Sequence, residues 1–307
     1  MSVLHRSFAD RRRRASKKLF HISKQVYHLS GLANSRYKTL VFVVGCQRSG
    51  TTLIERVLGQ DWRAKSYSEF SELTSQDTEN QIRLNPLPMV KEVVSKDKAS
   101  IIIIKPLVES QNIVTWLDYF PGSKALWMYR DYRDVIASSI KKFGPRNGIC
   151  DLWPIVENNR QNWRAEHVSE SVKALVLKHF CEEMNPYDAA ALFWFARNSL
   201  YFDLNLYGRS DVMLCKYEDL VTNPLTVVGR IYAFLEHPFP ANRTTSTIHA
   251  SSVGKGKDIA LSPQVEQPCS ELWQKLEAVY QLRVGRHSSE QKELGQGREQ
   301  NSGNGIV

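Results

Sequence analysis

Residues 40–52 read LVFVVGCQRSGTT, an apolar run followed by a loop that two glycines frame. The apolar run 40–44 predicts a buried β-strand, and the following LIERVL (53–58) is typical of a helix. Between them, Gly45 and Gly50 stand five residues apart, which is the frame of a phosphate-binding loop. Such a loop turns backbone N–H groups toward an anion, and the helix N-terminus adds partial positive charge. The stretch therefore predicts an anion site in an α/β protein.

The loop lacks the lysine of nucleoside-triphosphate enzymes. Thr51 occupies the lysine position, and Thr52 follows it. The predicted strand 100–104 ends in Lys105, where such enzymes carry a magnesium-binding Asp. Arg48 in the loop and Lys105 can neutralise a leaving phosphate without a metal ion. We therefore expect a nucleotide whose 5′ group needs only protein cations.

Short β-branched runs alternate with amphipathic stretches along the chain, which is the pattern of βαβ units around a parallel sheet. The predicted strands are 40–45, 64–67, 100–104, 124–129 and 211–216. The predicted helices are 50–59, 79–96, 109–119, 132–143, 187–207, 224–236 and 270–281, with a further helical segment over 151–180. These elements predict an α/β domain over 40–285.

The charge of the chain is concentrated at its N-terminus. Residues 1–40 hold ten Lys/Arg against Asp10 alone. Their net charge of +9 equals the formal net charge of all 307 residues. We predict a basic N-terminal arm over 1–39, which is either solvated or in contact with an anionic membrane, polysaccharide or nucleic acid. At the other end, residues 286–307 are rich in Gly, Gln and Ser and predict a disordered tail.

Membrane, disulfide and metal signals are missing from the sequence. No stretch reaches the roughly 18 apolar residues that span a bilayer, and the N-terminus lacks the apolar core of a secretion signal. A soluble, cytoplasmic protein is predicted. The five cysteines are scattered, without a CxxC pair or a His at ligand spacing, so neither a disulfide frame nor a metal site is expected.

A second anion site is predicted in KALWMYRDYRDVIASS (124–139). If the strand closes at Arg130 and Ser138 lies two turns into the next helix, both side chains approach one anion. The alternative is that the charges of this segment cap the helix and form surface ion pairs. Two anion sites suit a nucleotide that is phosphorylated at both ends.

These motifs resemble those of a known family. GCQRSGTTL (45–53) looks like the 5′-phosphosulfate loop of the sulfotransferases that use 3′-phosphoadenosine 5′-phosphosulfate (PAPS), and YRDYRDVIASS (129–139) looks like their 3′-phosphate motif. CKYEDL (215–220) resembles a strand-to-helix segment late in the same domain. The resemblance covers about 40–260. It implies a single α/β domain with a parallel sheet like that of P-loop nucleotide kinases, and a sulfotransferase that uses PAPS without a metal ion.

The resemblance also implies nucleotide contacts. Arg48 replaces the lysine of cytosolic aryl and steroid enzymes, and with Lys105-Pro106 it resembles the tyrosyl-protein and bacterial branch. Leu53 stands where cytosolic members have an adenine-stacking Trp, so the base must be held otherwise. SSVGKGKD (251–258) is similar to the late loop that closes over the nucleotide. The expected contacts are Gln47, Arg48, Ser49, Gly50, Thr51 and Thr52 at the 5′ end, Arg130 and Ser138 at the 3′-phosphate, and Ser252 and Lys255 in the late loop.

Sulfuryl transfer needs cations on the departing oxygen and a base for the acceptor proton. The catalytic His of cytosolic members is replaced by Leu107. Glu69 falls where the tyrosyl-protein branch carries its catalytic Glu, so Arg48, Lys105 and Glu69 are the expected catalytic residues. The alternative for Glu69 is a surface carboxylate or helix cap, with Glu72 as the nearest substitute base.

Other functions remain open at this point. One is a P-loop kinase or other nucleoside-triphosphate enzyme, and another is a non-catalytic nucleotide-binding protein that docks through its basic arm. The acceptor is a hydroxyl or amine on a sugar, lipid, phenol or peptide, and we favour carbohydrate or glycolipid. FWFARNSLYF (193–202), with Trp153 and Trp163, is either an acceptor pocket or plain core.

Overall fold

The computed structural model describes residues 19–20, 22–28, 30, 38–78, 81–106, 108–240, 242–245 and 248–301, with side chains from 242–243 and 286–301 left out. Most of the predicted basic arm therefore lies outside the described residues. The chain forms two compact units. Unit 1 comprises Met1–Val44, Thr51–Leu126 and Asn223–His249, and unit 2 comprises Gly45–Gly50, Trp127–Thr222 and Ala250–Val307.

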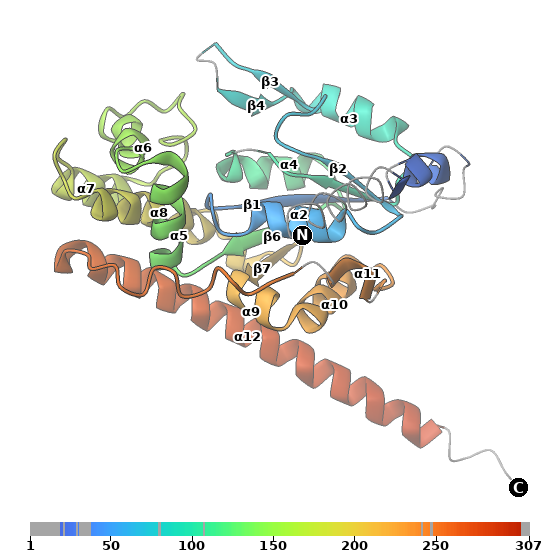
Figure 1. The fold of residues 1–307 in the computed structure, drawn as a ribbon. Helices are drawn as coiled ribbons and strands as arrows, with labels where there is room; N and C mark the ends of the chain where they lie inside the picture. The colour runs from blue at the N-terminus through green and yellow to red at the C-terminus, as the bar shows by residue number, and fades with distance from the viewer. Residues whose placement is uncertain are drawn as a thin grey trace, which may run out of the picture. The chain divides into compact units, whose positions relative to one another are not determined.

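A five-stranded parallel sheet runs through the fold in the order β2-β5-β1-β6-β7 (Figure 1). Its strands are β1 (Thr39–Gly45), β2 (Ala64–Tyr67), β5 (Ile101–Ile104), β6 (Lys124–Tyr129) and β7 (Val212–Lys216). All five strands predicted from apolar runs are confirmed. The four isoleucines of β5 are at most 1% exposed, as expected for a strand covered on both faces. Thr39 of β1 and Ala64 of β2 both pair with Ile101 of β5.

Unit 1 carries helices from two parts of the sequence, one that contains β1, β2 and β5 and one that follows α9. They are α2 (Thr51–Leu58), α3 (Leu87–Lys96), the 3₁₀ turn η1 (Ser110–Asn112), α4 (Ile113–Tyr119), α10 (Pro224–Phe234) and α11 (Asn242–Thr245). Residues 19–20 and 22–28, from the predicted arm, are helical as well. The rings of Phe20 and Tyr27 lie 5.3 and 6.0 Å from that of Trp62, so this part of the arm packs on unit 1.

The helix predicted over 79–96 begins only at Leu87, so that prediction was wrong for its first half. Before it, β3 (Thr74–Gln76) and β4 (Ile82–Leu84) form an antiparallel hairpin with Ser75 opposite Arg83. Pro86 explains the late start, because proline lacks an N–H and disfavours helical backbone in the residue before it.

Unit 2 is built around a buried helix. Its helical elements are α5 (Tyr132–Phe143), α6 (Asn147–Val156), α7 (Glu170–His179), α8 (Pro186–Asp203), η2 (Leu206–Gly208), α9 (Tyr217–Thr222) and α12 (Pro263–Asn301). Helix α8 is buried along most of its length and packs against α5, α6 and α12 (Figure 1). The segment predicted as helical over 151–180 is interrupted by turns between α6 and α7.

The C-terminal part differs from the disordered tail predicted from residue 286. The backbone of α12 continues to Asn301, and residues 302–307 lie outside the described residues. Leu276 and Tyr280 are buried and anchor the helix, and extending an existing helix costs less than starting one. Within the described part of the chain, no helix combines the length and apolarity needed to cross a membrane.

Candidate active site

The loop Gly45–Gly50 joins β1 to α2 at the strand where the sheet order reverses, the position at which open α/β sheets bind ligands. Gly45 has φ 131°, and a Cβ there would lie 2.2 Å from the Met128 carbonyl oxygen. Gly50 has φ 96°, and a Cβ there would lie 2.4 Å from the Tyr217 ring. Both positions therefore require glycine. In the same loop Arg48 adopts φ 67°, a left-handed backbone that a non-glycine residue rarely takes.

The predicted 5′-end residues occupy different environments. Ser49 is fully buried, while Arg48 is exposed. Thr51 and Thr52 are the first two residues of α2, half-buried and exposed respectively. Their position at a helix N-terminus agrees with the anion site expected from the sequence.

Within unit 2 the structure brings Arg48 of the loop together with two residues of the second predicted anion site. Arg48 Nε donates a hydrogen bond of 3.0 Å to Ser138 Oγ. Ser138 lies two turns into α5, which Asp131 caps by accepting from the Asp134 backbone N–H. Arg130 Nη1 donates to the Arg48 carbonyl oxygen at 3.4 Å. Arg130 and Ser138 thus both contact Arg48, and their shared binding of one anion stays a prediction.

Arg130 is 5% exposed at the end of β6 and is held from several sides. Its Nη2 donates to Asp134 Oδ2 at 3.2 Å and to the Ser252 carbonyl oxygen. Its guanidinium carbon lies 4.4 Å from the centroid of the Tyr217 ring. The buried Nε has no hydrogen-bond partner among the described residues, so the guanidinium retains a donor for a ligand.

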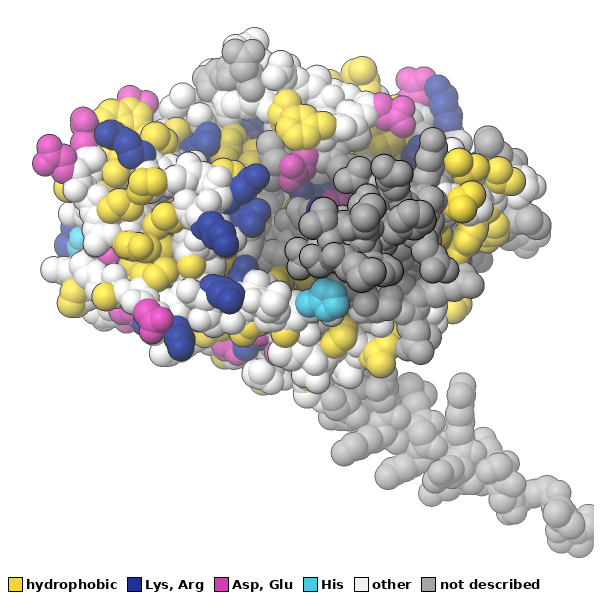
Figure 2. Space-filling model, in the orientation of Figure 1, with side chains coloured by type: hydrophobic (Ala, Val, Ile, Leu, Met, Phe, Trp, Pro, Cys, Tyr) yellow, Lys and Arg dark blue, Asp and Glu magenta, His cyan; other side chains and the backbone are white. Residues whose placement is uncertain are grey.

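These side chains line one cavity of about 630 Å³ in unit 2. Five cationic residues and two predicted hydroxyl residues share it; they are Arg48, Arg130, Lys141, Lys142, Lys255, Ser138 and Ser252. Figure 2 shows Lys and Arg side chains gathered on one face, over the region that α5 occupies in Figure 1. A cavity with five cations concentrates anionic ligands.

Sequence reasoning missed four residues of this cluster. Tyr217 fills the space beside Gly50 and hydrogen-bonds through its hydroxyl to Ser252 Oγ. The CKYEDL motif was the available signal for it. Lys141 and Lys142 follow Ser138 by three and four residues, the spacing that places helical side chains on one face. Asp134 is the fourth, and nothing in the sequence separated it from the other acidic residue of the same helical turn.

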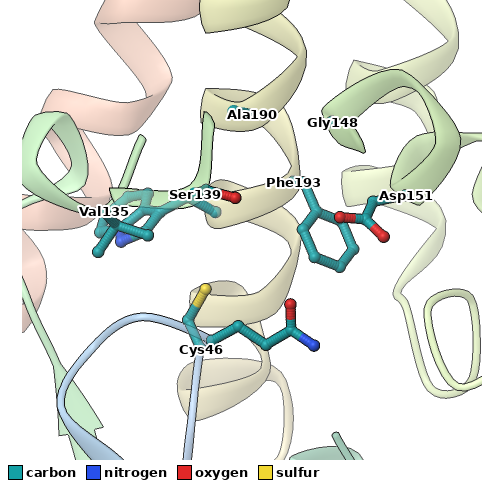
Figure 3. Close-up of a pocket in the computed structure, with 9 residues that line it drawn as sticks. Cys46, Val135, Ser139, Gly148, Asp151, Ala190 and Phe193 are labelled. Atoms are coloured by element: carbon teal, nitrogen blue, oxygen red, sulfur yellow. The ribbon is translucent and has the colours of Figure 1, made fainter. Parts of the chain in front are cut away.

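Gln47 lies elsewhere in unit 2. With Cys46, Ser139, Asp151 and Phe193 it lines a separate small cavity and not the cation-lined one. In Figure 3 the Cys46 sulfur points toward Ser139 of α5 and Phe193 of α8. Burial raises the pKa of the Cys46 thiol to about 12, so this cysteine is uncharged at neutral pH. The predicted nucleotide contact of Gln47 has no support from this geometry.

The aromatic segment proposed as acceptor pocket or core is largely core. Trp163, Phe193 and Trp194 are at most 6% exposed, Phe195 and Phe202 are half-buried, and Trp153 is exposed, at 36%.

Unit 1 holds the remaining two predicted catalytic residues. Strands β2 and β5 run parallel, with Tyr67 opposite Ile104, so the residues that follow them meet at one edge. The Lys105 N–H donates to the Tyr67 carbonyl at 2.9 Å, and the Lys105 side chain, 2% exposed, forms an ion pair with Glu69. The Glu69 carboxylate is partly exposed, which leaves it open to a ligand.

The surroundings of Glu69 distinguish it from Glu72, the alternative candidate for the base. Thr74 Oγ1 donates to the Glu69 carbonyl at 3.0 Å, and the neighbouring Ser68 hydroxyl donates to the buried carboxylate of Glu55. Glu55 was not predicted from the sequence. Glu72 lies on the surface, 3.7 Å from Lys65, with both side chains well exposed. Glu69 is therefore the carboxylate that is anchored and paired with a buried cation.

Metal ligands do not gather in the described part of the chain, where no group of three or more His, Cys, Asp or Glu side chains is placed to hold an ion.

Comparison with known proteins identifies the family. A family model described as the sulfotransferase domain matches residues 38–278. The sulfotransferase domain from the curacin biosynthetic pathway is 18% identical and covers 78% of this chain and 98% of its own, with a TM-score of 0.49. A sulfotransferase from Alicyclobacillus acidocaldarius is 15% identical over 82% of this chain and 96% of its own, with a TM-score of 0.43. A mouse sulfotransferase complexed with PAP is 14% identical over 75% of this chain and 69% of its own, with a TM-score of 0.35. No curated protein sequence matches significantly. Since the family model spans most of the chain, the protein belongs to the sulfotransferase family and is an enzyme of sulfuryl transfer.

Proposed function

We propose that this sulfotransferase takes its sulfuryl group from PAPS and binds that nucleotide in the cation-lined cavity of unit 2. The observation that carries the proposal is the convergence of Arg48, from the loop after β1, with Arg130 and Ser138, from the segment after β6. The sequence predicted these residues as two separate anion sites, and they line one cavity.

The residues fit a ligand with phosphate at both ends. Five cations line the cavity, and the buried Arg130 Nε lacks a partner among the described residues. The glycines at 45 and 50 let the loop backbone fold where any side chain would collide. The cavity volume lies within the roughly 300–1,000 Å³ of ordinary ligand pockets.

We assign the nucleotide contacts by end. Backbone N–H groups of Ser49–Thr52 and the Arg48 side chain hold the 5′ group. Arg130 and Ser138 hold the 3′-phosphate, supported by Lys141 and Lys142. Ser252 and Lys255 contact the nucleotide from the late loop. Tyr217 keeps Arg130 and Ser252 in place through its ring and hydroxyl.

Three side chains carry the chemical step in this proposal. When bound, PAPS supplies the sulfuryl group and departs as adenosine 3′,5′-bisphosphate (PAP). Arg48 and Lys105 donate hydrogen bonds to the oxygen on which negative charge grows. The Glu69 carboxylate accepts the proton of the acceptor hydroxyl or amine, and its pairing with buried Lys105 orients it beforehand. These residues act without a metal ion.

The acceptor and the cellular location are proposed from the sequence. We propose a hydroxyl-bearing acceptor, with carbohydrate or glycolipid favoured over phenol or peptide. A cytoplasmic location and contact of the basic arm with an anionic surface follow from the sequence and stay predictions.

The test ranks ligands by thermal shift and follows with a transfer assay. PAP should raise Tm more than AMP and more than ATP with magnesium, because only PAP places phosphate at both ends. Radiolabelled sulfate should then move from PAPS to an acceptor in a screen without added metal. A larger shift with ATP and magnesium than with PAP would overturn the proposal.

A further inference from the structure

We propose that Asp134 is a positioning residue that latches the late loop, residues 251–258, onto the first turn of α5. The latch fixes Arg130, Ser252 and Lys255 at the 3′ end of the nucleotide. This inference rests on the proposed function, since it assigns the latch to 3′-phosphate recognition.

The contacts of the Asp134 carboxylate carry the inference. Its side chain is 3% exposed, and both oxygens face donors from other segments of unit 2. Oδ1 accepts from the Gly256 N–H at 2.8 Å, and Oδ2 accepts from the Gly254 N–H at 2.9 Å. Oδ2 also accepts from Arg130 Nη2 at 3.2 Å. One carboxylate therefore joins the late loop to the cation expected at the 3′-phosphate.

The late loop lies directly on the α5 backbone at this point. A Cβ on Gly256 would stand 2.1 Å from the Arg133 carbonyl oxygen and 2.7 Å from the Asp134 nitrogen. Gly254 adopts φ 73°, which favours glycine. The two glycines allow the approach that brings both N–H groups to the carboxylate.

The latch sets the position of the loop residues that face the cavity. Lys255 stands between the two bonded glycines, and Ser252 lies two residues before Gly254. The Ser252 carbonyl accepts from Arg130, and its hydroxyl bonds to Tyr217. Loss of the Asp134 bonds would free the segment that carries Lys255.

Electrostatics argue against a direct ligand role for this carboxylate. A buried negative charge beside a phosphate subsite repels the phosphate, so the benefit of Asp134 must come from the geometry that it imposes. Asn in its place keeps the shape, but its amide group has one acceptor oxygen and presents N–H donors where Asp134 accepts.

The alternative to the positioning role is that Asp134 only stabilises α5, because it lies in the first turn, where a negative charge favours the helix. Asp131 provides the matched control. It caps the same helix by accepting from the Asp134 N–H, whereas among the described residues the bonds to the Gly254 and Gly256 N–H groups go to the Asp134 carboxylate.

The experiment measures PAP and AMP affinities of the full chain by calorimetry for wild type, Asp134→Asn and Asp131→Ala. Asp134→Asn should weaken PAP binding about tenfold or more and AMP binding less than about threefold, as expected for lost bonds to a charged group. Its KM for PAPS should rise more than its kcat falls. Asp131→Ala should lower Tm and leave the ratio of the two affinities unchanged. Gly256→Ala should reproduce the loss in PAP affinity by displacing the loop.

A nucleotide-free readout separates the latch from the proposed function. Trypsin should cleave after Lys255 or Lys257 faster in Asp134→Asn than in wild type or Asp131→Ala. Unchanged cleavage would overturn the latch, as would equal weakening of PAP and AMP by Asp134→Asn. A third outcome is that Asp134→Asn is cleaved faster while the wild-type protein binds AMP as tightly as PAP. That outcome would overturn the proposed function and with it the role of the latch in 3′-phosphate recognition.

Discussion

Arg48 combines an unfavourable backbone with a specific side-chain contact. Its φ of 67° costs on the order of 1 kcal/mol, and its Nε reaches Ser138 at 3.0 Å. A strained residue at a ligand loop is expected where the strain orients a functional group.

Arg48→Ala should therefore lower kcat for sulfuryl transfer by about 10²–10³-fold, the loss typical of removing one donor from developing charge. The measurement is the rate of label transfer from PAPS at saturation. Arg160→Ala, an exposed arginine paired with Glu170 in the same unit, serves as the control and should retain activity. Near-normal turnover of Arg48→Ala would refute its role.

Glu69 is the second residue on which the chemistry depends. Glu69→Gln should lower kcat by about 10²–10⁴-fold, the usual contribution of a general base, with a much smaller loss of PAP affinity. Glu72→Gln is the matched control, since Glu72 is an exposed carboxylate on the same loop. Equal losses of rate and affinity in Glu69→Gln would indicate a structural task for the Glu69–Lys105 pair instead.

At the scale of elements, unit 2 depends on close helix packing. Gly148 near the start of α6 touches the α8 backbone, and a Cβ there would lie 2.6 Å from the Ala190 nitrogen and 2.9 Å from the Ala189 carbonyl carbon. Backbone atoms cannot move aside as a flexible side chain can, so α6 and α8 must separate if this position gains a methyl group.

Gly148→Ala should lower the free energy of unfolding by about 1–3 kcal/mol, the usual cost of overpacking, measured by urea denaturation. Gly208→Ala tests the same substitution where no atom lies within 4 Å of the added Cβ, and it should leave stability unchanged or slightly higher. Similar losses in both variants would contradict the packing argument.

At the scale of the whole molecule, the charge asymmetry makes a prediction for the N-terminus. Residues 1–18 contain seven Lys/Arg against Asp10, most of the net charge of +9. Among the described residues, Phe20 and Tyr27 pack on Trp62, and a deletion of 1–18 leaves both in place.

That deletion should lower the salt concentration at which the protein elutes from heparin, while PAP affinity stays within about twofold. The elution salt of full-length and shortened chains is compared on one column. An unchanged elution position would show that the arm does not contact polyanions.

The sequence predicted those features that depend on local pattern. Uninterrupted apolar runs such as Ile101–Ile104 predicted buried strands, and Gly45 and Gly50 predicted a tight loop between a strand and a helix, while anion binding by that loop stays a prediction. Family membership decided between sulfuryl transfer and the two functions left open, a nucleoside-triphosphate enzyme and a non-catalytic nucleotide-binding protein.

Features that depend on tertiary contact were missed. The strands of the β3–β4 hairpin have three residues each, which is too short to show the alternation of a strand in the sequence. Gln47 was predicted to contact the nucleotide from its position in the loop motif, although it lines another cavity. Asp134 and Asp131 look alike in sequence, and only the late loop, more than a hundred residues away, tells them apart.

A crystal structure of the complex with PAP would show which residues hold each end of the nucleotide. We expect the 3′-phosphate within hydrogen-bond distance of the Arg130 guanidinium and Ser138 Oγ, and the 5′-phosphate against the backbone N–H groups of Ser49–Thr52. A nucleotide bound with its 3′-phosphate away from Arg130 and Ser138, or one that leaves the loop after β1 untouched, would contradict this expectation.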